Sequence, residues 1–468
     1  MAADVSRSHS TTVRSTHRTF REQNEVGWVD QNVSKTVPVS AGVVCALVGF
    51  TSSFAVVLAG LRAAGANSDQ AASGLTALSL AMGLSSVLLA WKFRMPITSA
   101  WSTPGAALLI SAGAAAGGWP AAVGAFLVTA VLLLATGLWP MLARVVARIP
   151  HSVAQAMLAG VLLPLCIAPV TALAKDPVVI APVLVVWLIA SAIRPRWAVP
   201  AAFGVALLVL TATLMREQSV PPASAWIPHL QVTAPSLTVA AVTGIALPLY
   251  IVTMAAQNIP GVAVMKGFGY QVPWRPTLTV TGIASLVAAP FGGHAVNLAA
   301  ISAALAAGPD ADPNPRRRWI AAITTGAVYC VLGVASTGLT LAVLAAPAGL
   351  VQAVAGVALL SAFAGACAGA MADESARLPA AVTLVVAASG TTVAGVGSAF
   401  WALLVGVIAY RLFRSTVPLQ RVSRRNIVSA NGPDPRARSF RRKSSEREGR
   451  RRPDSEPQDG GSARHRGT

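Results

Sequence analysis

The chain has 468 residues, of which 54% are hydrophobic and 11% are charged, and its mean hydropathy is +0.62. This composition excludes an ordinary soluble domain and a disordered chain, and it is typical of a protein that crosses a membrane many times. The formal net charge is +19. The four cysteines lie in apolar runs, where they behave as small hydrophobic residues, so we expect no disulfides.

Two polar ends flank the apolar body of the chain. Neither has enough large apolar side chains to fold alone, so we expect residues 1–36 to form a disordered leader and residues 415–468 a basic, disordered tail. The arginines of the tail can bind anionic lipid, or they can simply reinforce the topology. Residues 37–414 form the predicted membrane domain.

The membrane domain contains fourteen apolar segments, judged against the ~20 helical residues that cross a bilayer. They are residues 37–61, 71–90, 102–115, 119–142, 151–172, 177–193, 197–215, 236–259, 276–289, 297–309, 317–341, 346–371, 378–394 and 397–413. Several are shorter than a full crossing. We therefore predict an all-α polytopic fold of fourteen transmembrane segments.

The basic residues between these segments predict the orientation. An even number of crossings puts both termini on one side, and loops on that side hold twelve Lys or Arg residues against three on the other. The twelve are Lys92, Arg94, Arg144, Arg148, Arg194, Arg196, Lys266, Arg275, Arg316, Arg317, Arg318 and Arg377; the three are Arg62, Lys175 and Arg216. Because basic loops stay inside, we predict that both termini are cytoplasmic.

The two halves of the domain, about 37–215 and 236–413, look like an internal repeat. An offset of 194 residues places Pro96 on Pro290 and Thr103 on Asn297, and an offset of 205 places Ser52 and Ser53 on Gln257 and Asn258. Seven segments separate the copies, so the repeats are predicted to be inverted in the membrane. Interrupted segments at matching places in inverted repeats indicate the central site of a transporter.

The stretch APFGGHAVNLAAISAALAAGP, residues 289–309, is the clearest interrupted segment. Pro290, Gly292 and Gly293 discourage a helix, so we expect an extended piece followed by a half-helix from Asn297. Non-helical backbone at membrane depth occurs where it is buried in protein or lines a watery cavity. The matching segment MPITSAWSTPGAALLISAGA predicts a half-helix whose first turn is capped by Thr103.

Two half-helices that begin near the membrane centre would both present free amide groups and a positive dipole end. Such ends favour an anion, although they can also be ends that merely pack against neighbours. His294 interrupts an apolar run and is a candidate proton carrier, or else a structural hydrogen-bond donor. Gln257 and Asn258 are candidates for ligand contact or for bonding between helices.

Aromatic residues close to these positions are candidates for holding a ring, and each can equally be ordinary packing. They are Phe54, Trp101, Tyr250 and Phe291. The complete set of predicted substrate-binding residues is Ser52, Ser53, Phe54, Trp101, Ser102, Thr103, Tyr250, Gln257, Asn258, Gly293, His294 and Asn297. We find no metal-binding cluster, phosphate loop or nucleophile triad, so we expect neither an enzyme nor a bound cofactor.

Four segments together resemble the BenE family of benzoate/proton symporters, and the likeness runs from about Val37 to Arg414. They are MPITSAWSTPGAALL, ALPLYIVTMAAQNIPGV, APFGGHAVNLAAISAALAAGP and SGTTVAGVGSAFWALL. The resemblance implies a fold similar to that of uracil permease and sulfate-permease-type transporters. That fold has two inverted repeats of seven spans, with spans 3 and 10 discontinuous, and a core domain that moves against a gate domain.

The resemblance also implies uptake of benzoate with protons across a bacterial inner membrane. The acidic residues of the nucleobase transporters have no counterpart here, since Gln257 and His294 occupy those regions. We expect an aromatic carboxylate, protons and the lipid bilayer as partners, a homodimer as the candidate assembly, and no nucleic acid. A transporter for a nucleobase or an inorganic anion, and a membrane sensor or scaffold, are the alternatives.

Overall fold

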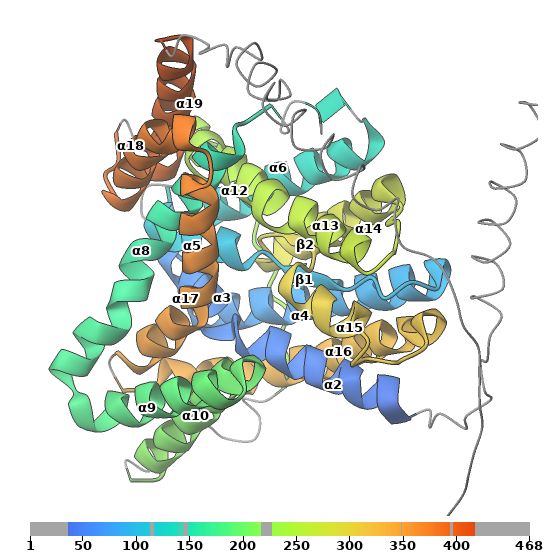
Figure 1. The fold of residues 1–468 in the computed structure, drawn as a ribbon. Coiled ribbons are helices and arrows are strands. Elements are labelled where there is room, and N and C mark those ends of the chain that lie inside the picture. The colour runs from blue at the N-terminus through green and yellow to red at the C-terminus, as the bar shows by residue number, and fades with distance from the viewer. Residues whose placement is uncertain are drawn as a thin grey trace, which may run out of the picture. The chain divides into compact units, whose positions relative to one another are not determined.

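The computed structural model describes residues 36–112, 117–139, 141–142, 144, 148–216, 227–347, 349–393 and 396–416. Most of these residues are helical (Figure 1). The predicted leader and tail lie outside the described residues, except for residues 36 and 415–416 at their inner ends. The domain boundaries predicted from the sequence therefore stay predictions.

Each of the fourteen predicted segments contains at least one helix. In the first half these are α2 (Thr36–Thr51), α3 (Phe54–Ala63), α4 (Ser68–Phe93), α5 (Thr103–Ala112), α6 (Trp119–Leu138), α8 (His151–Lys175), α9 (Pro177–Ile193) and α10 (Ala198–Arg216). In the second half they are α11 (Val239–Ala241), α12 (Leu247–Thr253), α13 (Ile259–Gly267), α14 (Trp274–Ala288), α15 (Ile301–Ala307), α16 (Trp319–Leu344), α17 (Leu350–Met371), α18 (Arg377–Ala388) and α19 (Ser398–Thr416).

Length and composition identify the chain as a polytopic membrane protein. Within the described ranges, eight helical stretches are long and apolar enough to cross a membrane. Three further apolar helices are shorter, namely Thr103–Ala112, Pro177–Ile193 and Ser398–Phe413. The number of crossings, fourteen, stays a prediction because several segments are too short to be identified by length alone.

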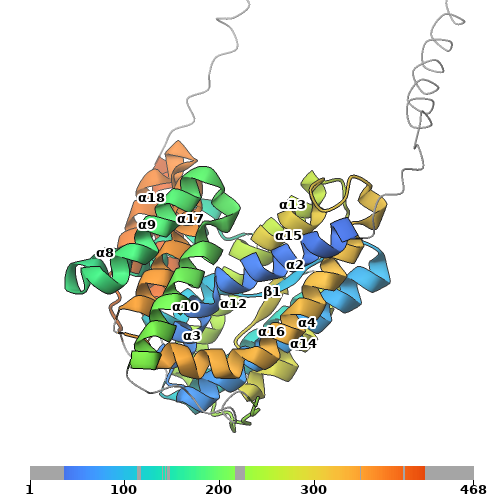
Figure 2. The same cartoon turned by 90° about the horizontal axis from the view of Figure 1, so that it is seen from below.

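The helices pack in two groups (Figure 2). In the first group α16 packs along α4 and α2, and α14 packs along α6 and α4. In the second group α8 packs against α17 and α18, α9 against α10, and α18 against α19. The groups meet where α3 contacts α17 and where α5 contacts α8.

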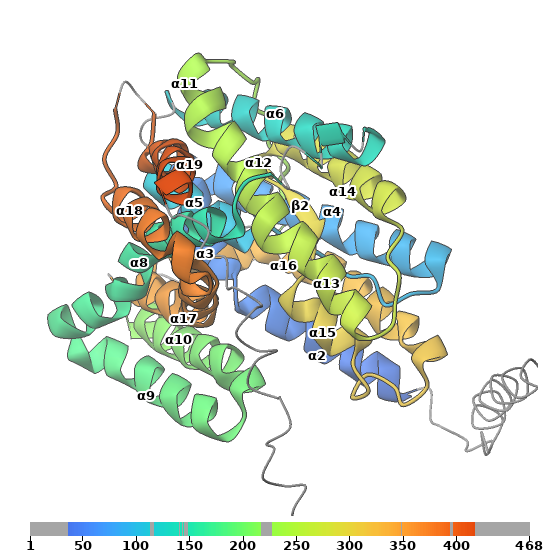
Figure 3. The ribbon, with the colours of Figure 1, turned by 45° about the horizontal axis from the view of Figure 1, so that its top comes forward.

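The rod formed by α11, α12 and α13 contains two π-helical turns (Figure 3). They cover Val242–Ala246 and Met254–Asn258. A π-helical turn adds a residue to the helix without breaking it. The disruption predicted near Gln257 and Asn258 is therefore a widened turn within a continuous rod.

A two-stranded antiparallel sheet lies inside the first group (Figure 1). Its strands are β1 (Ser99–Trp101) and β2 (Val296–Leu298), and Trp101 pairs with Val296. The pairing satisfies backbone groups that lipid would leave bare. The extended segments predicted in front of both half-helices are thus present, and they are bonded to each other.

The predicted half-helix start at Asn297 is wrong. Asn297 lies in the middle of β2, opposite Ala100, and the helix α15 begins only at Ile301. The backbone of this stretch is already used in the sheet, and Ala299 N–H extends the pairing by donating to the Thr98 carbonyl at 3.0 Å. Because the strand pairing continues through Ala299, the helix starts only after the pairing ends.

Candidate substrate site

The first turn of α5 is capped by Ser102. The Ser102 hydroxyl accepts from the N–H of Gly105 at 3.2 Å, and the Ser102 carbonyl accepts from the N–H of Ala106 at 2.8 Å. The predicted start of the helix at Thr103 is confirmed, but the predicted cap at Thr103 is wrong by one residue. The physical reason is that Thr103 is already helical, whereas a capping side chain belongs to the residue before the helix.

The Ser102 hydroxyl also reaches the second half of the chain. It shares a hydrogen bond of 2.8 Å with the Thr253 hydroxyl of α12. The Ser102 N–H donates to the carbonyl of Ala295 at 3.1 Å, and the His294 ring bonds the Ser102 carbonyl at 2.9 Å. Both halves of the chain therefore fix the N-terminus of α5.

A cavity with about 460 Å³ of empty space lies at the N-terminal ends of α5 and α15. Its lining comes from α2, α4, the α2–α3 junction, both interrupted segments, the second π-helical turn and α16. The lining residues are Val48, Gly49, Ser52, Ser53, Met82, Ala100, Trp101, Thr103, Gln257, Ala299, Ala300, Ser302 and Tyr329. We call it the central cavity. None of these lining residues carries a formal charge, so the site offers hydroxyl, amide and aromatic groups.

Five of the predicted site residues line the central cavity: Ser52, Ser53, Trp101, Thr103 and Gln257. The two serines lie where α2 ends and α3 begins, and their hydroxyls bond the carbonyl of Gly49 at 3.1 and 3.3 Å. Because hydroxyls bonded to their own helix keep free lone pairs, they can still contact a ligand. The structure therefore brings polar residues from both halves to one place.

Other predicted residues are not among the residues that line the cavity. Phe54 is fully buried and stacks on Phe50 with ring centroids 5.3 Å apart. The Tyr250 hydroxyl is bonded to Thr136 of α6 at 2.6 Å. Phe291, in the turn after α14, is outside the lining as well.

Asn258 and His294 hold the two interrupted segments in place. The Asn258 side-chain oxygen accepts from the N–H of Leu298 at 2.9 Å, which ties β2 to the rod. Gly293 closes the turn before β2 by donating to the carbonyl of Ala288 at 2.9 Å, and a side chain on Gly293 would meet the Ala288 methyl at 2.6 Å. These residues position the site.

Asn297 is buried, and among the described residues neither its side-chain oxygen nor its nitrogen has a hydrogen-bond partner. Burying such groups unpaired is costly. The Nδ1 atom of His294 is in the same condition. Both side chains can therefore still form hydrogen bonds close to the strands.

Sequence reasoning missed Tyr329 and Ser302. Tyr329 is 1% exposed, lies in the middle of α16 and lines the central cavity next to Ser302. The segment that contains it reads as an uninterrupted apolar span. The available signal was the residue type, because the chain has four tyrosines and this one falls in a span interior.

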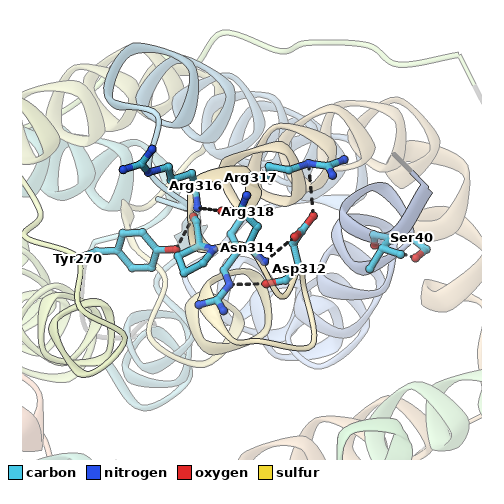
Figure 4. A network of polar contacts seen from close by, with 9 residues as sticks. Ser40, Tyr270, Asp312, Asn314, Arg316, Arg317 and Arg318 are labelled. Atoms are coloured by element: carbon cyan, nitrogen blue, oxygen red, sulfur yellow. Dashed lines mark hydrogen bonds and ion pairs between the residues drawn. The ribbon is translucent and has the colours of Figure 1, made fainter. Parts of the chain in front are cut away.

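A polar network holds the far end of α15 (Figure 4). Arg318 is 7% exposed and donates to the carbonyl of Ala307 at 2.8 Å and to the carbonyl of Asp312 at 2.7 Å. The Tyr270 hydroxyl donates to the carbonyl of Pro315 at 2.8 Å. The loop between α15 and α16 is thereby fixed to the α13–α14 connection, and α15 is held at both ends.

The fold of this chain resembles those of solved membrane transporters. The transmembrane domain of the bicarbonate transporter BicA from a cyanobacterium aligns with a TM-score of 0.54, 15% identity, and coverage of 79% of this chain and 96% of that one. The structure of SLC26A9 aligns with a TM-score of 0.52, 12% identity, and coverage of 87% and 69%. Fold and helix composition together define a multi-pass membrane protein.

The chain belongs to the benzoate membrane transport protein family, BenE, whose family model matches residues 32–412. Inner membrane protein YdcO of Escherichia coli strain K12 is 39% identical over 374 residues, which are 79% of this chain and 94% of that protein. Benzoate membrane transport protein of Acinetobacter baylyi is 29% identical over 386 residues, 81% of this chain and 95% of that one. Family membership identifies a transporter rather than an enzyme, as the sequence predicts.

Proposed function

We propose that this chain imports benzoate or a similar aromatic carboxylate together with protons. The observation that carries the proposal is the central cavity, which joins the N-terminus of a buried half-helix to an aromatic wall. A relative at 29% identity is named as a benzoate transport protein, which supports the same substrate class.

The carboxylate binds at the amide end of α5, where Thr103 begins the helix. A helix N-terminus favours a negative charge, and the side-chain amide of Gln257 adds an uncharged donor. The ring lies against Trp101 and the apolar Met82. An uncharged site of this kind binds an anion without burying a fixed cation.

Proton uptake, by the substrate or by His294, neutralises the site that holds the substrate. Elevator-like movement of one helix group against the other then exposes this site to the opposite side of the membrane. The two packing groups of helices support this division into a core, α2–α6 with α11–α16, and a gate, α8–α10 with α17–α19. We assign the central cavity to the core because all its lining residues come from that group.

The proposed topology is fourteen crossings in two inverted repeats, with both termini cytoplasmic in a bacterial inner membrane. The excess of basic residues in the loops on one side supports this orientation. A relative named as an inner membrane protein supports the location. A homodimer stays a prediction.

The test is uptake of radiolabelled benzoate into proteoliposomes with an imposed pH gradient. We expect accumulation driven by an acidic exterior and abolished by a protonophore. Uptake of uracil or bicarbonate in place of benzoate would transfer the assignment to a nucleobase or an inorganic anion. Binding without flux would identify a sensor or scaffold.

A further inference from the structure

A second, larger cavity lies between the two helix groups, with about 1090 Å³ of empty space. It is lined by α3, α5, α8, the end of α16, α17 and the turn between α16 and α17. The lining residues are Leu58, Ala59, Arg62, Ile110, Leu165, Ala168, Val343, Ala346, Pro347, Gly349, Val351, Gln352 and Ala355. Arg62 is the one charged residue in this lining.

Two helices lead from the central cavity to the second one. Along α5, Thr103 lines the first and Ile110 the second, ~10 Å further along the helix axis. Along α3, Ser53 at its start lines the central cavity, and Leu58 and Arg62 line the second. The two cavities therefore lie at different positions along the same two helices, α3 and α5.

A third, smaller cavity of about 290 Å³ lies beside the second one, between α3, α10, α16 and α17. It is lined by Ala55, and it shares Val343, Ala346 and Val351 with the second cavity. Its lining is entirely apolar. An apolar cavity of this kind, next to the second cavity, suits a ring and opposes a small hydrated ion.

The Arg62 guanidinium is at the end of α3 and keeps donors available. Its Nη1 donates to the carbonyl of Ala66 at 2.8 Å, and a guanidinium has five N–H donors in all. A planar guanidinium matches a carboxylate in shape and charge. The apolar residues that line the rest of the second cavity match an aromatic ring.

From this arrangement we infer that the second cavity is an access site for the aromatic carboxylate, in which Arg62 pairs with the carboxylate before the ring passes toward the central cavity. The inference rests on the proposed function for the class of ligand. In the proposed orientation the Arg316–Arg318 loop is cytoplasmic. The second cavity lies at the opposite end of α16, so it faces the outside.

The first experiment measures KM and maximal rate of benzoate uptake for charge variants. Arg62→Gln is expected to raise KM about threefold with a maximal rate within about twofold of wild type, because Arg62 is exposed and an exposed ion pair contributes only modestly to binding. Arg62→Lys retains most of the affinity. Lys175→Gln is the matched control, since Lys175 ends α8 outside the cavity lining.

The second experiment fills the cavity without changing charge. Ala168→Phe on α8 is expected to raise KM and to reduce equilibrium binding of benzoate from two molecules per chain to one. Ile167→Phe at the adjacent position is the control, because Ile167 is 48% exposed and outside the lining.

The outcomes separate this inference from the proposed function. If wild-type protein takes up no benzoate, the proposed function fails. If it does, and both Arg62→Gln and Ala168→Phe leave KM and the binding number unchanged, the access site alone is refuted. If phosphatidylglycerol in nanodiscs displaces the second benzoate, whereas phosphatidylcholine does not, the cavity is a lipid site and the inference is overturned.

Discussion

His294 donates a hydrogen bond of 2.9 Å from Nε2 to the backbone carbonyl of Ser102, where α5 begins. A carbonyl only accepts, so Nε2 carries the hydrogen and Nδ1 is an acceptor without a partner in the described part of the chain. His294 is fully buried and outside the lining of the central cavity. The geometry supports a positioning role for the imidazole.

Replacing His294 tests whether it positions the site or carries the proton. His294→Gln keeps a donor for the Ser102 carbonyl, so we expect benzoate accumulation under a pH gradient at no less than about half of wild type. His294→Leu removes the donor, and we expect uptake to fall about tenfold, the effect of about 1.4 kcal/mol. Loss of pH-driven accumulation in His294→Gln, with benzoate exchange retained, would instead make His294 the proton carrier.

Gly49 leaves room for the Tyr329 hydroxyl at the wall of the central cavity. A side chain at Gly49 would collide with that hydroxyl, so Gly49→Ala is expected to reduce benzoate uptake about fivefold or more. Gly204→Ala on α10 is the matched control, because no other group lies within 4 Å of the added methyl. Adding Tyr329→Phe to Gly49→Ala relieves the collision and is expected to restore part of the rate. Wild-type uptake by Gly49→Ala would contradict this account.

The sequence predicted the location of the interrupted segments but not how they end. Proline, glycine and small residues mark where a helix fails, and those local signals correctly placed breaks around Ser99 and Val296. The start of α15 was misplaced because Asn297 is a good local cap, whereas its real environment is a strand formed with Ala100. Pairing between residues 197 positions apart leaves no local signature.

The polar part of the candidate site could also be predicted from local sequence signals. Polar residues in apolar spans are conspicuous, and Ser52, Thr103 and Gln257 do meet at one cavity. Aromatic residues are common in any membrane core, so proximity in sequence could not separate Trp101, which lines the cavity, from Tyr250, which bonds α6. Tyr329 was missed because only packing brings α16 to the site.

Ser285 of α14 supports the second strand, and its loss should destabilise the site. Its hydroxyl accepts from the N–H of Val296 at 2.8 Å and donates to the carbonyl of Thr281 at 2.8 Å. Ser285→Ala leaves a buried N–H unpaired, which costs about 1–3 kcal/mol. We expect a lower unfolding temperature in detergent and faster amide exchange at Val296. Ser40→Ala, at an exposed hydroxyl in the first turn of α2, is expected to change neither.

Arg318 is expected to contribute more to stability than its neighbour Arg316. Arg318→Gln removes a buried cation that donates to two carbonyls, each bond being worth about 1.5–3 kcal/mol when one partner is charged. Arg316 is exposed, and Arg316→Gln removes the same charge from the same loop. Thermal unfolding in detergent should show a large decrease for the first variant and almost none for the second. Equal decreases would indicate that only net charge matters.

Tyr270 makes the stability of this loop sensitive to alkaline pH. Burial raises the pKa of Tyr270 above its ordinary value, and the charge of Arg318 opposes that change. A raised pKa means that the folded protein binds the phenolic proton more tightly than the unfolded chain. The stabilisation is therefore complete below about pH 10 and is lost as pH rises through the folded pKa.

The comparison of wild type with Tyr270→Phe isolates this effect, because both chains share every other titrating group. At pH 8 the variant lacks the hydrogen bond to Pro315 and is expected to unfold at a slightly lower temperature. The difference should shrink as pH rises above about 10, because ionised Tyr270 can no longer donate. A difference that grows with pH would mean that the ionised phenolate, held by Arg318, is the more stable form.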